Sequence, residues 1–136
     1  MIIKYFYYEL KSSFGHAPTV LSSIELIGTE KEKKDKGTYF SCFSNLTETL
    51  DMCEDVLVAL DKVASKKVEL DSVGLNDDML TVFFDFVQID ILIDDSLIGQ
   101  PEGRFTHDQI RKAVEGKIKF LNMKKQVGVG LEVDIG

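Results

Sequence analysis

The sequence predicts an α+β fold, with a mixed or largely antiparallel sheet of about six strands and two packed helices. Three observations support this prediction. Short segments rich in β-branched and aromatic residues alternate in polarity, two longer segments have helical periodicity, and links of hairpin length join the strand segments. The predicted order is βββ-α-ββ-α-β. With 44% hydrophobic and 29% charged residues, the chain is expected to form a single globular domain over residues 1–136.

Three strands are expected in the first third of the chain. Met1–Leu10 carries aromatic and β-branched side chains on both parities, which indicates a strand partly covered on both faces. Val20–Ile27 is a second strand, and Thr29–Gly37 is predicted to be the charged tip of a hairpin that leads into a third strand at Thr38–Phe43. Because three acids alternate with four lysines in this tip, we expect it to be solvated.

Helical periodicity is strongest between Asn45 and Lys66. An apolar residue recurs there at spacings of four and three, and Asn45 with Glu48 resembles a capping box. The apolar stripe consists of Leu46, Leu50, Cys53, Leu57, Leu60 and Ala64. We expect this helix to lie flat on a sheet.

The second predicted helix begins at Thr106. Thr106 is the expected N-cap, Gln109 its capping-box partner, and Phe105 packs on Ile110 as a hydrophobic staple. The buried stripe is Ile110, Ala113, Val114, Ile118 and Leu121, and the basic residues Arg111, Lys112, Lys117, Lys119, Lys124 and Lys125 are expected mostly outside it or in the last turn. Gly116 should weaken this helix by about 1 kcal/mol relative to alanine.

The remaining segments are predicted to be strands and loops. Val68–Leu75 is a strand, a turn at 76–78 follows, and one long strand continues to Ile93. Its apolar residues occupy even positions up to Phe86 and odd positions from Val87, so a continuous strand would need a β-bulge there. Residues 94–105 are expected to form a loop, and Leu131–Ile135 a last short strand.

Negative charge is concentrated in one part of the chain. The formal net charge is −7, yet Val68–Ile110 alone contains ten acids and one base, Arg104. Such an asymmetry carries information about partners rather than about the fold. The candidate partner-binding residues are the acids of the predicted turn, strand end and loop: Asp77, Asp78, Asp90, Asp94, Asp95 and Glu102.

Most familiar catalytic and cofactor sites are not indicated. There is no phosphate-binding loop, nucleophile elbow, zinc-protease motif or EF-hand loop, and we expect no catalytic residue, metal or cofactor. His16 and His107 are interpreted as loop and helix-start residues. Cys42 and Cys53 lack zinc-ligand spacing and are expected to be buried, reduced thiols. Without a signal peptide or a membrane-spanning segment, the chain is expected in the cytoplasm and not at a membrane.

Three alternatives remain open. A divalent-metal nuclease or phosphotransferase would need Asp90 and Asp94 to converge with Glu69 or Asp71. Nucleic-acid binding is disfavoured because the domain as a whole is acidic and only the second predicted helix carries a sizeable basic stretch. An oligomerisation or scaffold module, possible as a homodimer, would use the aromatic residues of the first strand.

The charge asymmetry favours binding to a basic protein. An acidic surface attracts a basic partner and increases its association rate. In size, acidity and architecture the chain resembles bacterial immunity proteins, including those that protect against contact-dependent growth-inhibition toxins. That resemblance implies a non-enzymatic inhibitor that neutralises a toxin domain, often a nuclease, by covering its active site or a nearby surface.

Overall fold

The computed structural model describes residues 1–11, 15 and 17–136. These residues form two antiparallel sheets and three α-helices. Sheet A has the strand order β2-β1-β7, and sheet B the order β3-β4-β5-β6. The α+β class is therefore confirmed, although the strands form two sheets rather than one. The elements in chain order are β1 (Ile2–Leu10), β2 (Thr19–Ile27), α1 (Glu30–Asn45), α2 (Leu50–Ala64), β3 (Asp71–Leu75), β4 (Asp78–Val82), β5 (Val87–Ile91), β6 (Arg104–Phe105), α3 (His107–Leu121) and β7 (Gly130–Asp134).

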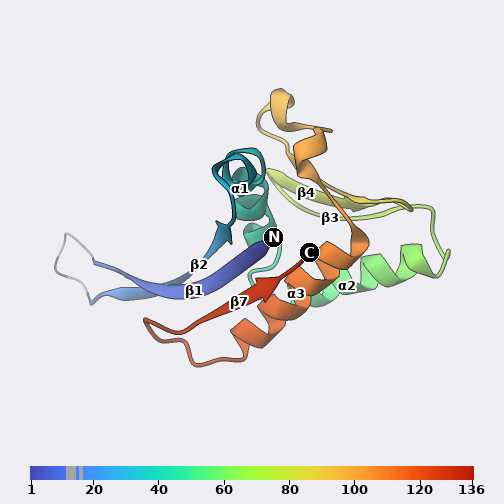
Figure 1. Ribbon diagram of the computed structural model, residues 1–136. Coiled ribbons are helices and arrows are strands. Elements are labelled where there is room, and N and C mark those ends of the chain that lie inside the picture. The colour runs from blue at the N-terminus through green and yellow to red at the C-terminus, as the bar shows by residue number, and fades with distance from the viewer. Residues whose placement is uncertain (12–14, 16) are drawn as a thin grey trace.

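Sheet A is built around β1. This strand pairs along its whole length with β2, from Ile2 opposite Ile27 to Leu10 opposite Thr19. β7 pairs only with the first part of β1, so β1 and β2 extend beyond it as a two-stranded arm (Figure 1). Tyr5 and Tyr7 are buried and stack on Phe120 of α3.

The expected hairpin tip at 29–37 is wrong, because this segment begins helix α1. Thr29 accepts a hydrogen bond from the Glu32 backbone and Glu32 bonds back to the Thr29 N–H, which makes a complete capping box. The predicted third strand forms the second half of the same helix. Its apolar residues, Tyr39, Phe40, Cys42 and Phe43, are buried as one helical face.

Helix α2 begins four residues later than the first helical residue predicted. Asn45 ends α1, and Thr49 is the N-cap of α2, accepting a hydrogen bond from the Met52 N–H. The predicted Asn45–Glu48 capping box is therefore wrong. The expected apolar stripe is buried at Cys53 and Leu60, while Leu50 at the start of the helix is exposed.

The long strand predicted at 79–93 is two strands, β4 and β5, joined by a hairpin at Phe83–Phe86. The change of parity in the sequence was read correctly, but its cause is a turn and not a bulge. Val82 lies opposite Val87 and Leu80 opposite Ile89, so both parities face the same core.

Helix α3 has the predicted start. Thr106 and Gln109 form the expected capping box, and Phe105 and Ile110 are both buried. The loop before α3 contains two short 3₁₀ segments, Asp95–Leu97 and Pro101–Gly103, and then β6.

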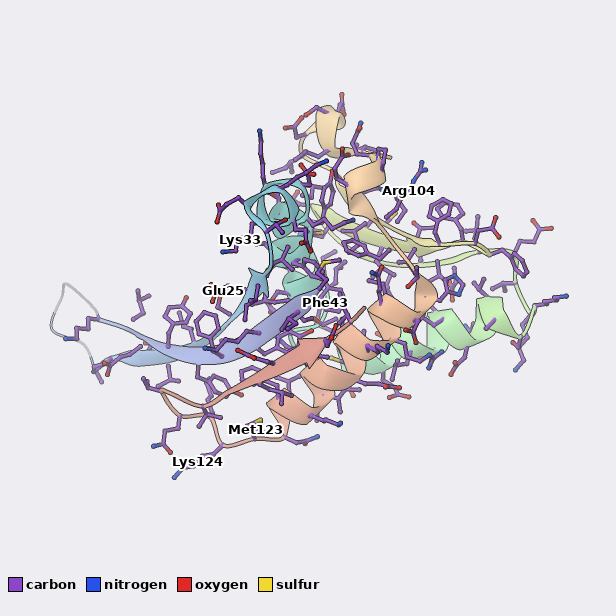
Figure 2. The ribbon with its side chains drawn as sticks, in the orientation of Figure 1. Glu25, Lys33, Phe43, Arg104, Met123 and Lys124 are labelled. Atoms are coloured by element: carbon purple, nitrogen blue, oxygen red, sulfur yellow. The ribbon has the colours of Figure 1, made fainter. Side chains whose placement is uncertain are left out.

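A continuous cluster of buried side chains connects both sheets with all three helices of the described residues. Phe43 has no exposed surface and lies near the centre of the molecule (Figure 2). The chain ends meet beside β1 and β7, where the Met1 ammonium donates to the Gly136 carbonyl at 3.0 Å (Figure 1). Helix α1 contacts β4 and β5 of sheet B, and helix α2 contacts β3 and β4.

Candidate functional site: the acidic end of sheet B

The strand register brings predicted site residues from three segments to one end of sheet B. Asp77 lies in the β3–β4 turn and accepts the Leu92 N–H through its backbone carbonyl at 2.8 Å. Asp78 lies opposite Ile91, and Asp90 opposite Met79, the next position along the ladder. We call this region the acidic end of sheet B: Asp77, Asp78, Asp90, Asp94, Asp95 and Glu102.

The loop after β5 folds back onto the sheet through polar contacts. Asp94 accepts hydrogen bonds from the backbone and hydroxyl of Ser96, and these bonds hold the pKa of its carboxyl below the usual value. Asp90 accepts the Gly99 N–H at 2.7 Å. These bonds fix the loop that carries Asp94, Asp95 and Glu102 beside the end of β5.

Glu102 is held next to helix α1. The ammonium of Lys36 donates to the backbone carbonyls of Glu102 and Arg104 at 3.1 and 3.2 Å. It also lies 4.4 Å from the centre of the Phe105 ring, and burial lowers its pKa. The lysine thus anchors this loop by its backbone and leaves the Glu102 carboxylate exposed.

Three of the acids influence the pKa of Tyr39 in α1. Its pKa is raised, first by burial and then by the charges of Glu102, Asp90 and Asp94. Its hydroxyl donates to the Leu97 carbonyl at 3.3 Å. Asp90, Asp94 and Glu102 therefore lie near one side chain, while Asp77 and Asp78 lie beside the end of β5 through the strand register.

None of the six carboxylates makes an ion pair with another described residue. The ion pairs of the described chain use other acids: Glu30, Asp61, Asp71, Asp108 and Asp134. Asp78, Asp90 and Asp94 accept internal hydrogen bonds from Asn45, Gly99 and Ser96. The side chains of Asp77, Asp95 and Glu102 are exposed and accept none from the described residues, so they are the most available to a partner.

Exposed apolar residues lie among these acids, and the sequence analysis did not select them. Ile93 is 74% exposed, Leu75 49% and Ile98 38%. Ile93 follows the last pairing of β5, and Leu75 lies opposite Asp78. Ile93 directly precedes Asp94 and Asp95 in the sequence. This position next to two acids was the only sequence feature from which its exposure could have been predicted. Apolar side chains within a charged rim are typical of protein interfaces.

The metal site considered from the sequence does not assemble as expected. Asp71 lies opposite Val82, at the far end of β4 from Asp90. Among the described residues no group of three or more His, Cys, Asp or Glu side chains is placed to hold a metal ion. His16 lies outside the described residues, and His107 donates through Nε2 to the Phe83 carbonyl at 2.6 Å, which supports the β4–β5 turn.

A second group of polar residues lies in the core, away from the acidic end. Lys117 is 1% exposed, contrary to the expectation that it lies outside the buried stripe. Its ammonium lies 5.1 Å from the centre of the Tyr5 ring, and burial lowers its pKa, an effect partly offset by Cys53 and Glu48. Burial raises the pKa of the Cys53 thiol to about 11. Burial also raises the pKa of the Cys42 thiol, by a larger amount. Both cysteines are buried and unbridged, as predicted.

Comparison with protein-family models, with curated proteins and with solved structures finds no match to this chain. No helix in the described part of the chain is long and apolar enough to cross a membrane.

Proposed function

We propose that this chain is a non-enzymatic inhibitor of the immunity type, which binds a basic surface of a toxin domain through the acidic end of sheet B. The observation that supports this proposal is that six acids, none with an ion pair among the described residues, gather at one end of sheet B; five acids elsewhere in the described chain have basic partners. Unpaired carboxylates held in one region create a negative potential that a basic protein would neutralise.

The apolar residues among the acids supply the second element of such an interface. Charge alone mainly increases the association rate, whereas buried apolar and aromatic contacts slow dissociation. Ile93 and Leu75 offer exposed apolar area next to Asp94 and Asp77. Together they fit a partner whose lysines or arginines surround an apolar contact.

The test compares two variants with the same change in charge. D95K/E102K reverses two acids that accept no hydrogen bond from the described residues, so the loop should keep its fold. E115K/E132K reverses two exposed acids of α3 and of β7, which belongs to sheet A. The partner is captured from an extract of the source cell at about 0.05 M salt, purified, and its binding measured by calorimetry.

We expect D95K/E102K to weaken binding at least tenfold and E115K/E132K to change it less than threefold. Binding by the unmodified chain should also weaken between about 0.05 and 0.5 M salt, because the Debye length falls from more than 10 Å to a few Å. Equal binding by both variants, or binding that does not respond to salt, would contradict the proposal.

A further inference from the structure

The outer edge of β3 is an open strand edge. Among the described strands only β4 pairs with β3, on one side. In a two-residue hairpin the closing pair, here Leu75 and Asp78, is hydrogen bonded, and bonding alternates along an antiparallel ladder. Asp71, Val73 and Leu75 therefore bond toward β4, while the backbone groups of Ser72 and Gly74 point outward.

The hydrogen bonds at the two ends of β4 agree with this alternation. Asp77 and Phe83, which flank β4, both bond to the β5 side: Asp77 accepts the Leu92 N–H and Phe83 donates to the Phe86 carbonyl. The odd-numbered residues of β4 therefore bond toward β5 and the even-numbered ones toward β3. Both Ser72 and Gly74 are exposed. The Ser72 N–H is held by the Asp71 carboxylate at 2.9 Å, which leaves the Gly74 N–H and the carbonyls of Ser72 and Gly74 open to a new strand.

The two ends of this edge carry opposite charge. Helix α2 runs antiparallel to β3, because Lys62 near its end pairs with Asp71 at 3.9 Å, while Asp55 near its start lines a hollow with Leu75. The first end carries three lysines, Lys62, Lys66 and Lys67, against two acids, Glu69 and Asp71, the second of which pairs with Lys62. The second end carries only acids among its charged residues: Asp51, Asp55, Asp77 and Asp78.

We propose that β3 pairs antiparallel with β3 of a second copy of this chain, which joins two copies of sheet B into one continuous sheet. A two-fold axis at Val73 places Ser72 opposite the second copy's Gly74, so the Gly74 N–H of each copy can donate to the Ser72 carbonyl of the other. The same axis brings the lysine end of one copy to the acidic end of the other. The opposite charges at its two ends make the edge complementary to itself.

Other features of β3 also suit a close approach of two backbones. Gly74 has no side chain, and a glycine inside a strand often marks a place where another backbone comes near. A hollow of about 100 Å³ lies between β3 and α2, lined by Leu46, Met52 and Leu75 among others. The longer edge strand β2 carries one acid, Glu25, and no base, so it lacks this charge pattern.

The hydrogen-bond part of the proposal is tested by sedimentation equilibrium on the full chain. G74P removes the outward N–H without touching the bonds to β4, and G74A keeps it. A Cβ at Gly74 would meet Asp78 O at 3.4 Å and Met79 Cε at 3.7 Å, which is ordinary contact. We expect a micromolar monomer–dimer equilibrium, at least a tenfold higher dissociation constant for G74P, and less than a threefold change for G74A. A chain that stays monomeric up to about 1 mM, or a dimer indifferent to G74P, overturns the proposal.

The charge part is tested by exchange. K66E/K67E and D55K/D77K should each dimerise at least tenfold more weakly than the original chain, because like charges then meet at both ends. Mixing the two variants should restore association, since the mixed dimer has opposite charges at each end. Failure of the mixture to associate overturns the charge pairing. The partner test above changes Asp95 and Glu102, and Glu102 adjoins β6 at the other edge of sheet B, so either proposal can fail without the other.

Discussion

A lysine in the core is the least expected residue of this fold. Lys117 is almost fully buried; its ammonium keeps a small contact with solvent and forms no ion pair with another described residue. The aromatic rings of Tyr5 and Phe120 are its nearest compensation, at 5.1 and 5.7 Å. Burial disfavours the charged form of the lysine and so lowers the stability of the fold. Packing of the aliphatic part of the side chain and contact with these rings offset only part of this loss.

Replacing this lysine by an apolar side chain of similar length should therefore stabilise the fold. We expect K117M to raise the free energy of unfolding by about 1 kcal/mol, because methionine keeps the packing and removes the desolvated charge. The measurement is urea unfolding at pH 7, with K119M, at an exposed position of the same helix, as the control. A loss of stability in K117M would mean that the ammonium is better compensated than the geometry indicates.

The buried thiol of Cys53 should make stability depend on pH. Its pKa in the fold is about 11, against an ordinary value of 9.0, because burial favours the neutral thiol. The thiol ionises first in the unfolded chain, so its stabilising contribution is complete below pH 9 and is lost as pH rises toward 11. We expect a loss on the order of 2 kcal/mol over this range. Since other groups also titrate there, the measured quantity is the difference in urea unfolding between the original chain and C53A, which should shrink across the same range.

At the scale of elements, helices and strands were predicted well where a local sequence pattern, such as a capping box or an apolar stripe, determines the structure. The α3 capping box and the apolar stripe of α2 are local signals, and both are present in the structure. The α1 segment was misread because its charged first half and aromatic second half each resemble another structure. The capping box of Thr29 and Glu32 was the signal that should have decided the matter.

The β4–β5 hairpin could not have been predicted from turn residues. Its central residues are Phe84 and Asp85, and the only non-glycine described residue with a positive φ is Lys66, so this turn needs no glycine or asparagine. The carbonyl of Phe83 bonds instead to His107, which is 24 residues away in the sequence. A tertiary contact thus supports a turn that local residue preferences do not favour, and sequence patterns do not record such contacts.

The same limit applies to the acidic end of sheet B. The acids could be selected from their concentration in the sequence, and the register of β4 and β5 brings them together. That β4 and β5 lie side by side depends on the hairpin, which was not predicted. The apolar residues Ile93 and Leu75 could not be separated from core residues, because exposure is a property of the assembled sheet.

Two helical glycines should respond oppositely to alanine. A Cβ at Gly116 of α3 would clash with Cγ2 of Val133 in β7, whereas one at Gly37 of α1 meets nothing within 4 Å. Alanine gains about 1 kcal/mol of helix propensity at either site, and the clash at Gly116 costs about 1–3 kcal/mol. We expect G37A to stabilise the fold by up to about 1 kcal/mol and G116A to destabilise it, as measured by thermal and urea unfolding.

A second change identifies the cause of the Gly116 effect. Val133→Ala removes the methyl groups that a Cβ at Gly116 would meet. G116A/V133A should therefore be more stable than the sum of the two single changes predicts. Simple additivity would show that the close approach of α3 to β7 is not what requires glycine at this position.

At the scale of the whole molecule, the two sheets share their interior. Tyr5 of sheet A, Leu80 of sheet B and Ile110 of α3 belong to one continuous cluster of buried residues. Neither sheet has a separate core among the described residues. The expectation of a single domain therefore becomes a prediction about unfolding, in which both sheets should lose their structure in one cooperative transition.

The two buried thiols can report on this cooperativity from different places. Cys42 lies against sheet B, where its Sγ donates to the Asp90 carbonyl at 3.8 Å, and Cys53 donates to the Thr47 carbonyl at 3.6 Å and lies close enough to Lys117 to influence its pKa. In the single-cysteine variants C53A and C42A, the remaining thiol should become reactive with the same dependence on urea, after correction for each variant's own stability. Earlier labelling of Cys42 would show that sheet B opens by itself. Equal dependence is expected because Phe43, beside Cys42 in α1, is fully buried in the cluster that also contains Cys53, so exposing either thiol requires that shared core to open.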